Sequence, residues 1–213
     1  MRRPARLADE VHERLYAQLM SQNIPPGARI SIDNLVREMG ISHTPIREAL
    51  SRLEAQGLVV KTHLIGYSAA NQIDRARLAH LYDLRLLLEP YAASMAATNV
   101  TNDQFAQLQA LDASMRDVDA STPDGYGAFA SLDGQFHDLI AQNSGNELVH
   151  EALARLNTHV HLFRLHFHAR ATSEANTEHG RLLEAIAASD PKAAETAMRE
   201  HVLASRRRFA DQT

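Results

Sequence analysis

Apolar residues recur every three to four positions along most of this chain, which is the pattern of amphipathic helices. The first such stretch covers residues 7–20 and carries Leu7, Val11, Leu15 and Leu19. The segment IPPGARI at residues 24–30 interrupts the pattern, because two prolines and a glycine favour a turn before a short extended piece. We therefore predict a first helix over residues 7–20, followed by a turn.

Two further helices and a hairpin are predicted before residue 70. SIDNLVREMG (31–40) is a short helix that stops at its glycine, and HTPIREALSRLEAQGLV begins another. In that helix Thr44 is the expected cap and Pro45 fits the first turn, where no N–H is needed. Its buried stripe is Ile46, Leu50 and Leu53. LVVK and GYSAA, joined by THLI, read as two short strands. The order of elements predicts a winged helix-turn-helix.

From Ile73 onward the helical period continues and no strand signal occurs. Six helices are expected, at residues 73–99, 102–119, 125–143, 147–170, 173–189 and 191–210. The fold class is therefore mainly α: an N-terminal winged helix-turn-helix domain (1–70) and a C-terminal antiparallel all-helical bundle (71–213).

Composition and charge narrow the function classes. The chain has no cysteine, which excludes disulfides and thiolate metal sites. It shows neither a signal peptide nor an apolar stretch of membrane-spanning length, so a soluble, cytoplasmic protein is expected. Residues 1–70 hold nine Lys/Arg against seven Asp/Glu, whereas the rest is acidic and holds nine of the 12 histidines. A basic head on an acidic, His-rich body indicates two separate roles.

The predicted third helix has the polar, basic N-terminal face that reads the major groove of DNA. Arg47 can fork onto a guanine edge or a phosphate. An ordinary amphipathic helix with solvated charges is the alternative, and the ordered run of turn, helix and wing argues against it. The candidate DNA contacts are His43, Thr44, Arg47, Glu48, Arg52, Lys61, His63 and Gly66.

The segments PPGARI and ISHTPIREALSRLEAQGLV resemble the DNA-binding head of GntR-family bacterial transcription factors. The resemblance implies a homodimer that reads pseudo-palindromic double-stranded operator DNA. Two departures remove positive charge: His43 replaces the usual arginine before TP, and Leu64 and Ile65 replace a basic pair before Gly66. A changed operator preference or a weaker backbone affinity is expected from them.

In the body, four polar side chains fall on apolar helix faces: Asp133, His137, His179 and His201. Burying them is costly unless each finds a partner. A divalent cation satisfies all four, and three imidazoles with one carboxylate suit Zn, Ni, Mn or Fe. The alternative is an Asp133–His137 hydrogen bond and two satisfied core histidines.

The blocks LDGQFHDLIAQNSGN, EHGRLLEAI and HVLASRRR resemble the effector domain called FCD in GntR members of the FadR type. That resemblance implies a metal held by Asp133, His137, His179 and His201, with a small carboxylate effector at its open positions. Six helices, rather than seven, indicate the shorter VanR-like subgroup.

Candidate effector contacts are Arg85, Asn157, His161 and Arg164. Arg85 could equally pair with Asp133 or Glu89, and the other three could form a solvated or dimer-facing stripe. His159, His166 and His168 stay unassigned, and the arginines at 206–208 are interpreted as a solvated helix end. The favoured function is a ligand-responsive regulator, most simply a repressor and not an enzyme. A metal sensor and, less favoured, a metal-dependent hydrolase remain alternatives.

Overall fold

The computed structural model describes residues 4–165 and 169–210, and it divides into two compact units at Gln72/Ile73. Each unit has its own hydrophobic core and is treated by itself. His166 and His168, unassigned in the sequence, lie outside the described residues. Within the described residues, no helix is both long and apolar enough to cross a membrane.

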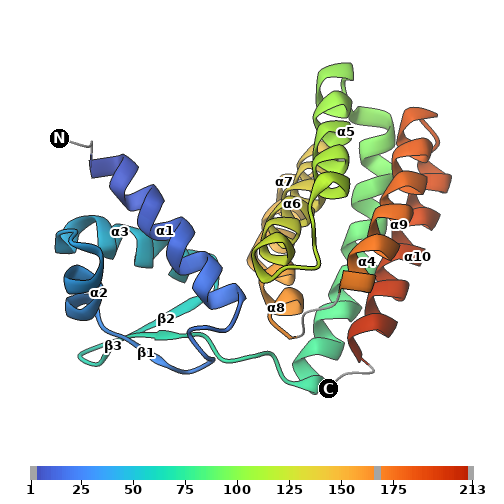
Figure 1. The fold of residues 1–213 in the computed structure, drawn as a ribbon. Coiled ribbons are helices and arrows are strands. Elements are labelled where there is room, and N and C mark those ends of the chain that lie inside the picture. The colour runs from blue at the N-terminus through green and yellow to red at the C-terminus, as the bar shows by residue number, and fades with distance from the viewer. Residues whose placement is uncertain (1–3, 166–168, 211–213) are drawn as a thin grey trace. The chain divides into compact units, whose positions relative to one another are not determined.

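The first unit contains three helices and a small antiparallel sheet (Figure 1). The helices are α1 (Pro4–Met20), α2 (Ile32–Met39) and α3 (His43–Ala55), and the strands are β1 (Arg29–Ile30), β2 (Val59–Thr62) and β3 (Gly66–Ala69). The strand order is β1-β3-β2. Apolar side chains of α1 and α3 form the core, and Ile46, Leu50 and Leu53 are fully buried as predicted. The winged helix-turn-helix prediction is confirmed.

The start of α3 differs from the prediction. The helix begins after Ser42, whose backbone is extended and whose side chain makes no capping hydrogen bond. Thr44 therefore lies inside the first turn and is not the cap. The other end is as expected: Gly57 has φ 73°, and the N–H of Leu58 donates to the carbonyl of Leu53 at 2.9 Å. This closure turns the chain directly into β2.

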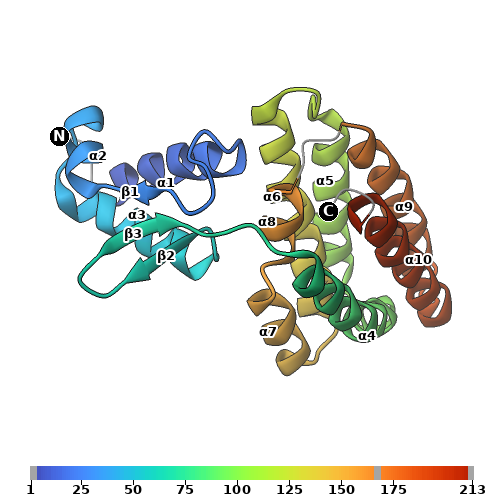
Figure 2. The ribbon, with the colours of Figure 1, turned by 90° about the horizontal axis from the view of Figure 1, so that it is seen from below.

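The second unit is entirely helical in the residues that are described (Figures 1 and 2). Its helices are α4 (Arg75–Asn99), α5 (Asn102–Asp117), α6 (Pro123–Asn143), α7 (Glu147–Arg155), α8 (Thr158–Phe163), α9 (Ala169–Ala187) and α10 (Pro191–Ala210). α10 packs along both α4 and α9, whereas α6 packs against α4, α5 and α8. The inward faces of α4, α6, α9 and α10 therefore share one core.

One predicted helix, at residues 147–170, is wrong as a single element. The structure ends α7 at Arg155 and begins α8 after Asn157, which has the left-handed backbone φ 48°, ψ 39°. Asparagine tolerates this conformation better than most residues. The described part of the second unit therefore has seven helices, and the count of six on which the VanR-like assignment rested is corrected.

The break between α7 and α8 leads to a stability prediction. Asn157→Gly should leave the free energy of unfolding nearly unchanged, since glycine adopts φ 48° without a Cβ penalty. Asn157→Val should lower it by about 1–2 kcal/mol, because a β-branched residue is strained there. Urea unfolding followed by circular dichroism measures both. Equal stability of the two variants would show that the turn is not fixed by this backbone conformation.

Candidate functional site

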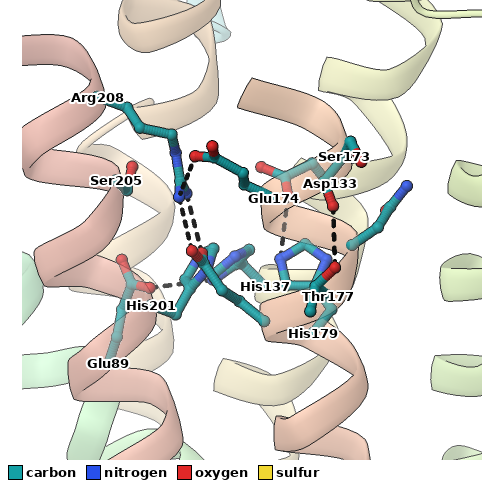
Figure 3. A network of polar contacts seen from close by, with 12 residues as sticks. Glu89, Asp133, His137, Ser173, Glu174, Thr177, His179, His201, Ser205 and Arg208 are labelled. Atoms are coloured by element: carbon teal, nitrogen blue, oxygen red, sulfur yellow. Dashed lines mark hydrogen bonds and ion pairs between the residues drawn. The ribbon is translucent and has the colours of Figure 1, made fainter. Parts of the chain in front are cut away.

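Three buried histidines meet in the core of the second unit. His137 comes from α6, His179 from α9 and His201 from α10 (Figure 3). They are 8%, 0% and 4% exposed, and one ring nitrogen of each lies within 4.8 Å of those of the other two. Nitrogens that share one zinc ion stand about 3–4 Å apart, because each is bound at about 2.0–2.1 Å. The three imidazoles are close enough for a single ion.

Asp133 lies one helical turn before His137 and is also buried. Its Oδ2 accepts a hydrogen bond from His159 Nδ1 at 2.7 Å, and its Oδ1 lies 3.4 Å from His179 Nε2. That second distance is long for a hydrogen bond. It agrees with the separation, about 3.3 Å, of two ligands on a tetrahedral ion. Asp133 thus presents one oxygen toward His179. The group of ligand atoms that lie within 4.8 Å of one another consists of the three histidines and does not include Asp133, so the four-ligand set stays a prediction.

The protonation and bonding of the histidines suit coordination. His137 Nε2 and both ring nitrogens of His179 are buried and have no hydrogen-bond partner among the described residues. Burial, together with the nearby charge of His201, holds the pKa of His179 well below its usual value, and burial likewise lowers the pKa of His201. Neutral imidazole is the form that binds a metal. The orphaned nitrogens are what a metal ion would satisfy.

The pKa of Asp133 is set by the same cluster. Burial by itself would raise it, yet the neighbouring His159, His137 and His179 hold the pKa of this carboxyl far below its usual range. Asp133 is therefore an anion at neutral pH. An anionic carboxylate beside neutral imidazoles is a complete donor set for a divalent cation.

Glu178, in α9, connects the cluster to an arginine. Its Oε2 accepts from His201 Nδ1 at 2.7 Å, and Arg208 forks onto both of its oxygens at 2.6 and 2.9 Å. Although burial opposes it, these hydrogen bonds lower the pKa of Glu178 to about 2. The interpretation of residues 206–208 as a solvated helix end is therefore wrong for Arg208, whose side chain is only 14% exposed.

Arg85 and Glu89, one turn apart on α4, form a second buried pair. Arg85 Nε donates to Glu89 Oε1 at 2.5 Å, and Nη2 donates to Oε2 at 3.2 Å. This arrangement is one of the two carboxylate pairings left open for Arg85. Glu89 Oε2 also lies 3.0 Å from His137 Nδ1 (Figure 3), although the alignment falls outside hydrogen-bond geometry. Burial by itself would raise the pKa of Glu89, yet the charge of Arg85 beside it lowers that pKa.

His159 is a site residue that the sequence left unassigned. It lies on α8, and a Cβ added to Gly134 on α6 would meet its ring at 3.4 Å. The imidazole therefore lies within van der Waals distance of α6 at Gly134 while it reaches Asp133. The left-handed backbone of Asn157, which separates α7 from α8, does not interrupt the apolar period. The contact between His159 and Asp133 therefore could not be predicted from the sequence pattern.

A small cavity of about 20 Å³ adjoins the cluster. That volume holds roughly one water molecule. Its polar lining comes from α4, α6, α8 and α10, and the residues are Arg85, Asp133, His159, His201, Ser205 and Arg208. Of the four candidate effector contacts, Arg85 alone belongs to this lining among the described residues. Arg164 is buried elsewhere, and His161 and Asn157 are partly exposed.

In the first unit, the candidate DNA contacts are all exposed, and they lie on α3 and the β2–β3 wing. Two of them have partners within the unit: Arg52 Nη1 donates to Asp9 Oδ1 at 2.6 Å, and His43 Nε2 lies 3.1 Å from Asp33. Arg47 makes no such contact with the residues that the structure describes, and its exposed side chain projects from α3. Leu64 and Ile65 at the wing tip are 94% and 65% exposed.

The chain matches known families over most of its length. Residues 7–66 match the gntR family of bacterial regulatory proteins, and residues 80–204 match the FCD domain. The two matched segments fall on the two structural units.

Individual relatives agree with this assignment. The Nta operon transcriptional regulator of Aminobacter aminovorans is 32% identical over 60% of this chain and 59% of its own length. A probable D-xylose utilization operon transcriptional repressor of Paenarthrobacter nicotinovorans is 26% identical over 93% of this chain and 86% of its own. Among solved structures, Escherichia coli McbR/YncC has a TM-score of 0.69 at 23% identity, covering 97% of this chain and 98% of its own. This chain belongs to the GntR family of transcriptional regulators and combines a GntR winged helix-turn-helix with an FCD domain.

Proposed function

We propose that this regulator is a homodimeric, DNA-binding repressor that a small organic acid controls by binding at a metal site in the helical domain. One observation carries the proposal. Two of the four buried candidate ligands, Asp133 and His201, line a cavity that also presents Arg85 and Arg208. The other two, His137 and His179, carry buried ring nitrogens without a hydrogen-bond partner among the described residues. A cation and two guanidinium groups around one space suit a carboxylate. The name of the Paenarthrobacter relative supports repression.

Asp133, His137, His179 and His201 would hold the ion, which we propose to be Zn, Ni, Mn or Fe. The bound ion would act as a Lewis acid that attracts a carboxylate. Asp133 Oδ1 and His179 Nε2 already stand at a spacing that one ion can bridge. The protein's own part is to exclude water and to hold the ligands in their coordinating forms.

The effector must enlarge the cavity, because about 20 Å³ does not admit an organic acid. Leu162 of α8 and Phe209 of α10 form its apolar wall, so one or both helices shift when the acid enters. Asn157, His161 and Arg164 lie on or beside α8 and would reach the acid only through that shift. A ligand that fits one arrangement of α8 better than another biases the equilibrium between them.

Two other functions are weaker. A hydrolase needs a general base near the ion, yet Asp133, Glu89 and Glu178 are each engaged by histidine or arginine. A regulator in which the ion itself is the signal uses the same four ligands. Its distinguishing property would be a DNA affinity that responds to chelation and to no organic acid.

For the homodimer, α4 offers a suitable surface. Leu84, Leu87 and Tyr91 follow one face of this helix at spacings of three and four, and they are 43%, 71% and 43% exposed. A row of large apolar side chains in water is unfavourable unless a partner covers it. A second copy, packing the same face by two-fold symmetry, would bury both rows at once.

The DNA proposal is tested by gel shift on DNA flanking the regulator's own gene, over a series of salt concentrations. Arg47→Ala should weaken DNA binding about tenfold or more, since a guanidinium that contacts a base contributes about 1–3 kcal/mol. If Arg47 contacts a phosphate instead, the slope of log affinity against log salt concentration should fall by about one unit. Arg199→Ala, on the helical domain, is the matched control. The absence of any shift at low salt would remove the repressor proposal.

The metal proposal is tested by elemental analysis of purified protein. The wild type should carry about one equivalent of metal, and the His137→Ala/His179→Ala variant should carry almost none, because half of the ligand set is gone. His150→Ala is the control, since this histidine is 30% exposed and pairs with Asp138. Equally low metal in wild type and double variant, after growth with added Zn, Ni, Mn and Fe, would contradict the site.

The dimer proposal is tested by sedimentation. Leu87→Glu should convert the dimer to a folded monomer at micromolar concentration, because two buried like charges would face each other across the two-fold axis. Leu64→Glu, at the wing tip, is a control of similar exposure. A dimer that survives Leu87→Glu unchanged would place the interface elsewhere.

A further inference from the structure

Two carboxylates outside the ligand set each contact an imidazole of the cluster and an arginine. Glu178 accepts from His201 Nδ1 at 2.7 Å and holds Arg208 by two hydrogen bonds. On the opposite side of the cluster, Glu89 holds Arg85 by two hydrogen bonds and lies 3.0 Å from His137 Nδ1. The same arginine–carboxylate–imidazole order therefore occurs twice, from different helices.

The Glu178 contact decides which nitrogen of His201 is free. With Nδ1 donating its proton to the carboxylate, Nε2 keeps a lone pair and can bind an ion. If the proton were on Nε2, coordination there would be blocked. Glu178 also fixes the ring's orientation, since His201 is 4% exposed and its Nδ1 donates to this carboxylate.

In both arginine–carboxylate–imidazole series, the arginine reaches the cavity. Arg85 and Arg208 line it together with Ser205, whose hydroxyl lies 3.5 Å from Arg85 Nη1 and 2.9 Å from the Tyr82 hydroxyl. An anion entering this space competes with Glu89 and Glu178 for the same guanidinium groups. Glu178, the carboxylate that orients His201, is thus also a group that the anion must displace.

The charge of the cluster favours such an anion once an ion is bound. Two arginines stand against three carboxylates, of Asp133, Glu89 and Glu178, so a divalent ion leaves one excess positive charge. Glu174 lies 3.6 Å from Arg208, but its side chain is 45% exposed and screened by water. A buried excess charge is costly, and a single small carboxylate would cancel it.

We propose that Glu178 is a positioning residue shared by the two ligands: it orients His201 for the metal ion and exchanges Arg208 with the anion that enters the cavity. This inference rests on the metal and organic-acid site proposed above. When the anion takes the donors of Arg208, both oxygens of Glu178 become available to His201. A stronger acceptor on Nδ1 makes Nε2 a better metal ligand. The acid and the ion therefore raise each other's affinity, as linkage requires.

A purely structural clamp between α9 and α10 is the competing explanation for the Arg208–Glu178 pair. A clamp predicts lower stability but an unchanged ion affinity in the folded variants. It also predicts that glutamine, which loses the charge that holds Arg208, behaves like alanine. If Glu178 is a shared positioning residue, Glu178→Ala weakens the ion affinity and Glu178→Gln does not behave like Glu178→Ala. The reason is that the amide oxygen of glutamine still accepts a hydrogen bond from His201 Nδ1.

The first experiment measures Zn²⁺ affinity by competition with a chromophoric chelator and records the Co²⁺ absorption spectrum of the full chain. Glu178→Ala should weaken Zn²⁺ binding about 10–100-fold and change the Co²⁺ bands, whereas Glu178→Gln should remain within about a few-fold of the wild type. Glu195→Ala, which removes an exposed glutamate paired with Arg199, is the control. Circular dichroism of the metal-free variants checks folding.

The second experiment adds formate, acetate, lactate and malonate to the metal-loaded protein and follows its melting temperature. At least one acid should stabilise the wild type and Arg199→Gln, and Arg208→Gln should lose that shift. The same acid should tighten Zn²⁺ binding about fivefold or more in the wild type, a gain that Arg208→Gln also loses.

The outcomes separate this inference from the proposed site. Metal binding by the wild type with an equal affinity in Glu178→Ala would overturn the positioning role and leave the metal site intact. An acid shift that persists in Arg208→Gln would overturn the exchange of Arg208. If the wild type binds no metal, the site itself is wrong, and the inference fails with it.

Discussion

The helical domain is built around the burial of polar side chains that cannot satisfy one another. His137, His179 and His201 meet where α6, α9 and α10 converge, and an unpaired buried polar group costs about 1–3 kcal/mol. Aliphatic residues at these positions would avoid that cost. The donor types and spacings fit a divalent cation, which is the occupant that we propose for the cluster.

The groups around the cluster follow from the same constraint. Imidazoles coordinate only when neutral and correctly oriented, and buried carboxylates supply the orientation. Glu178 and Glu89 in turn need counter-charges, which Arg208 and Arg85 provide. Breaking such a buried pair typically costs about 3–5 kcal/mol. Both arginines also border the cavity, so the charges that stabilise the metal ligands are the ones available to an anion.

The winged domain has a different constraint, since the side chains on its recognition face must stay polar and free of partners within the protein. Arg47 projects from α3 without a hydrogen-bond or ion-pair partner in the described part of the chain, whereas Arg52 is engaged by Asp9. Of the two arginines in REALSR, the structure therefore favours Arg47 for DNA and gives Arg52 a role in joining α3 to α1. Leu64 and Ile65 expose apolar surface at the wing tip, where GntR relatives are expected to carry a basic pair, so a weaker salt-dependent part of DNA binding stays a prediction.

The sequence by itself determined the elements whose signals are local. Helical periodicity, the PPG turn and Gly57 defined the winged domain, and the apolar faces around Asp133, His137, His179 and His201 indicated inward-pointing ligands. The resemblance to FCD domains joined those four into one proposed site. Only the tertiary structure decided what surrounds them. Asn157 breaks the helix with a left-handed backbone and leaves the apolar period unchanged. The sequence therefore predicted neither α8 as a separate helix nor the contact of His159 with Asp133. Arg208 looks like a solvated arginine in sequence because its partner, Glu178, is 30 residues away, and a pairing at that distance depends on how the helices pack.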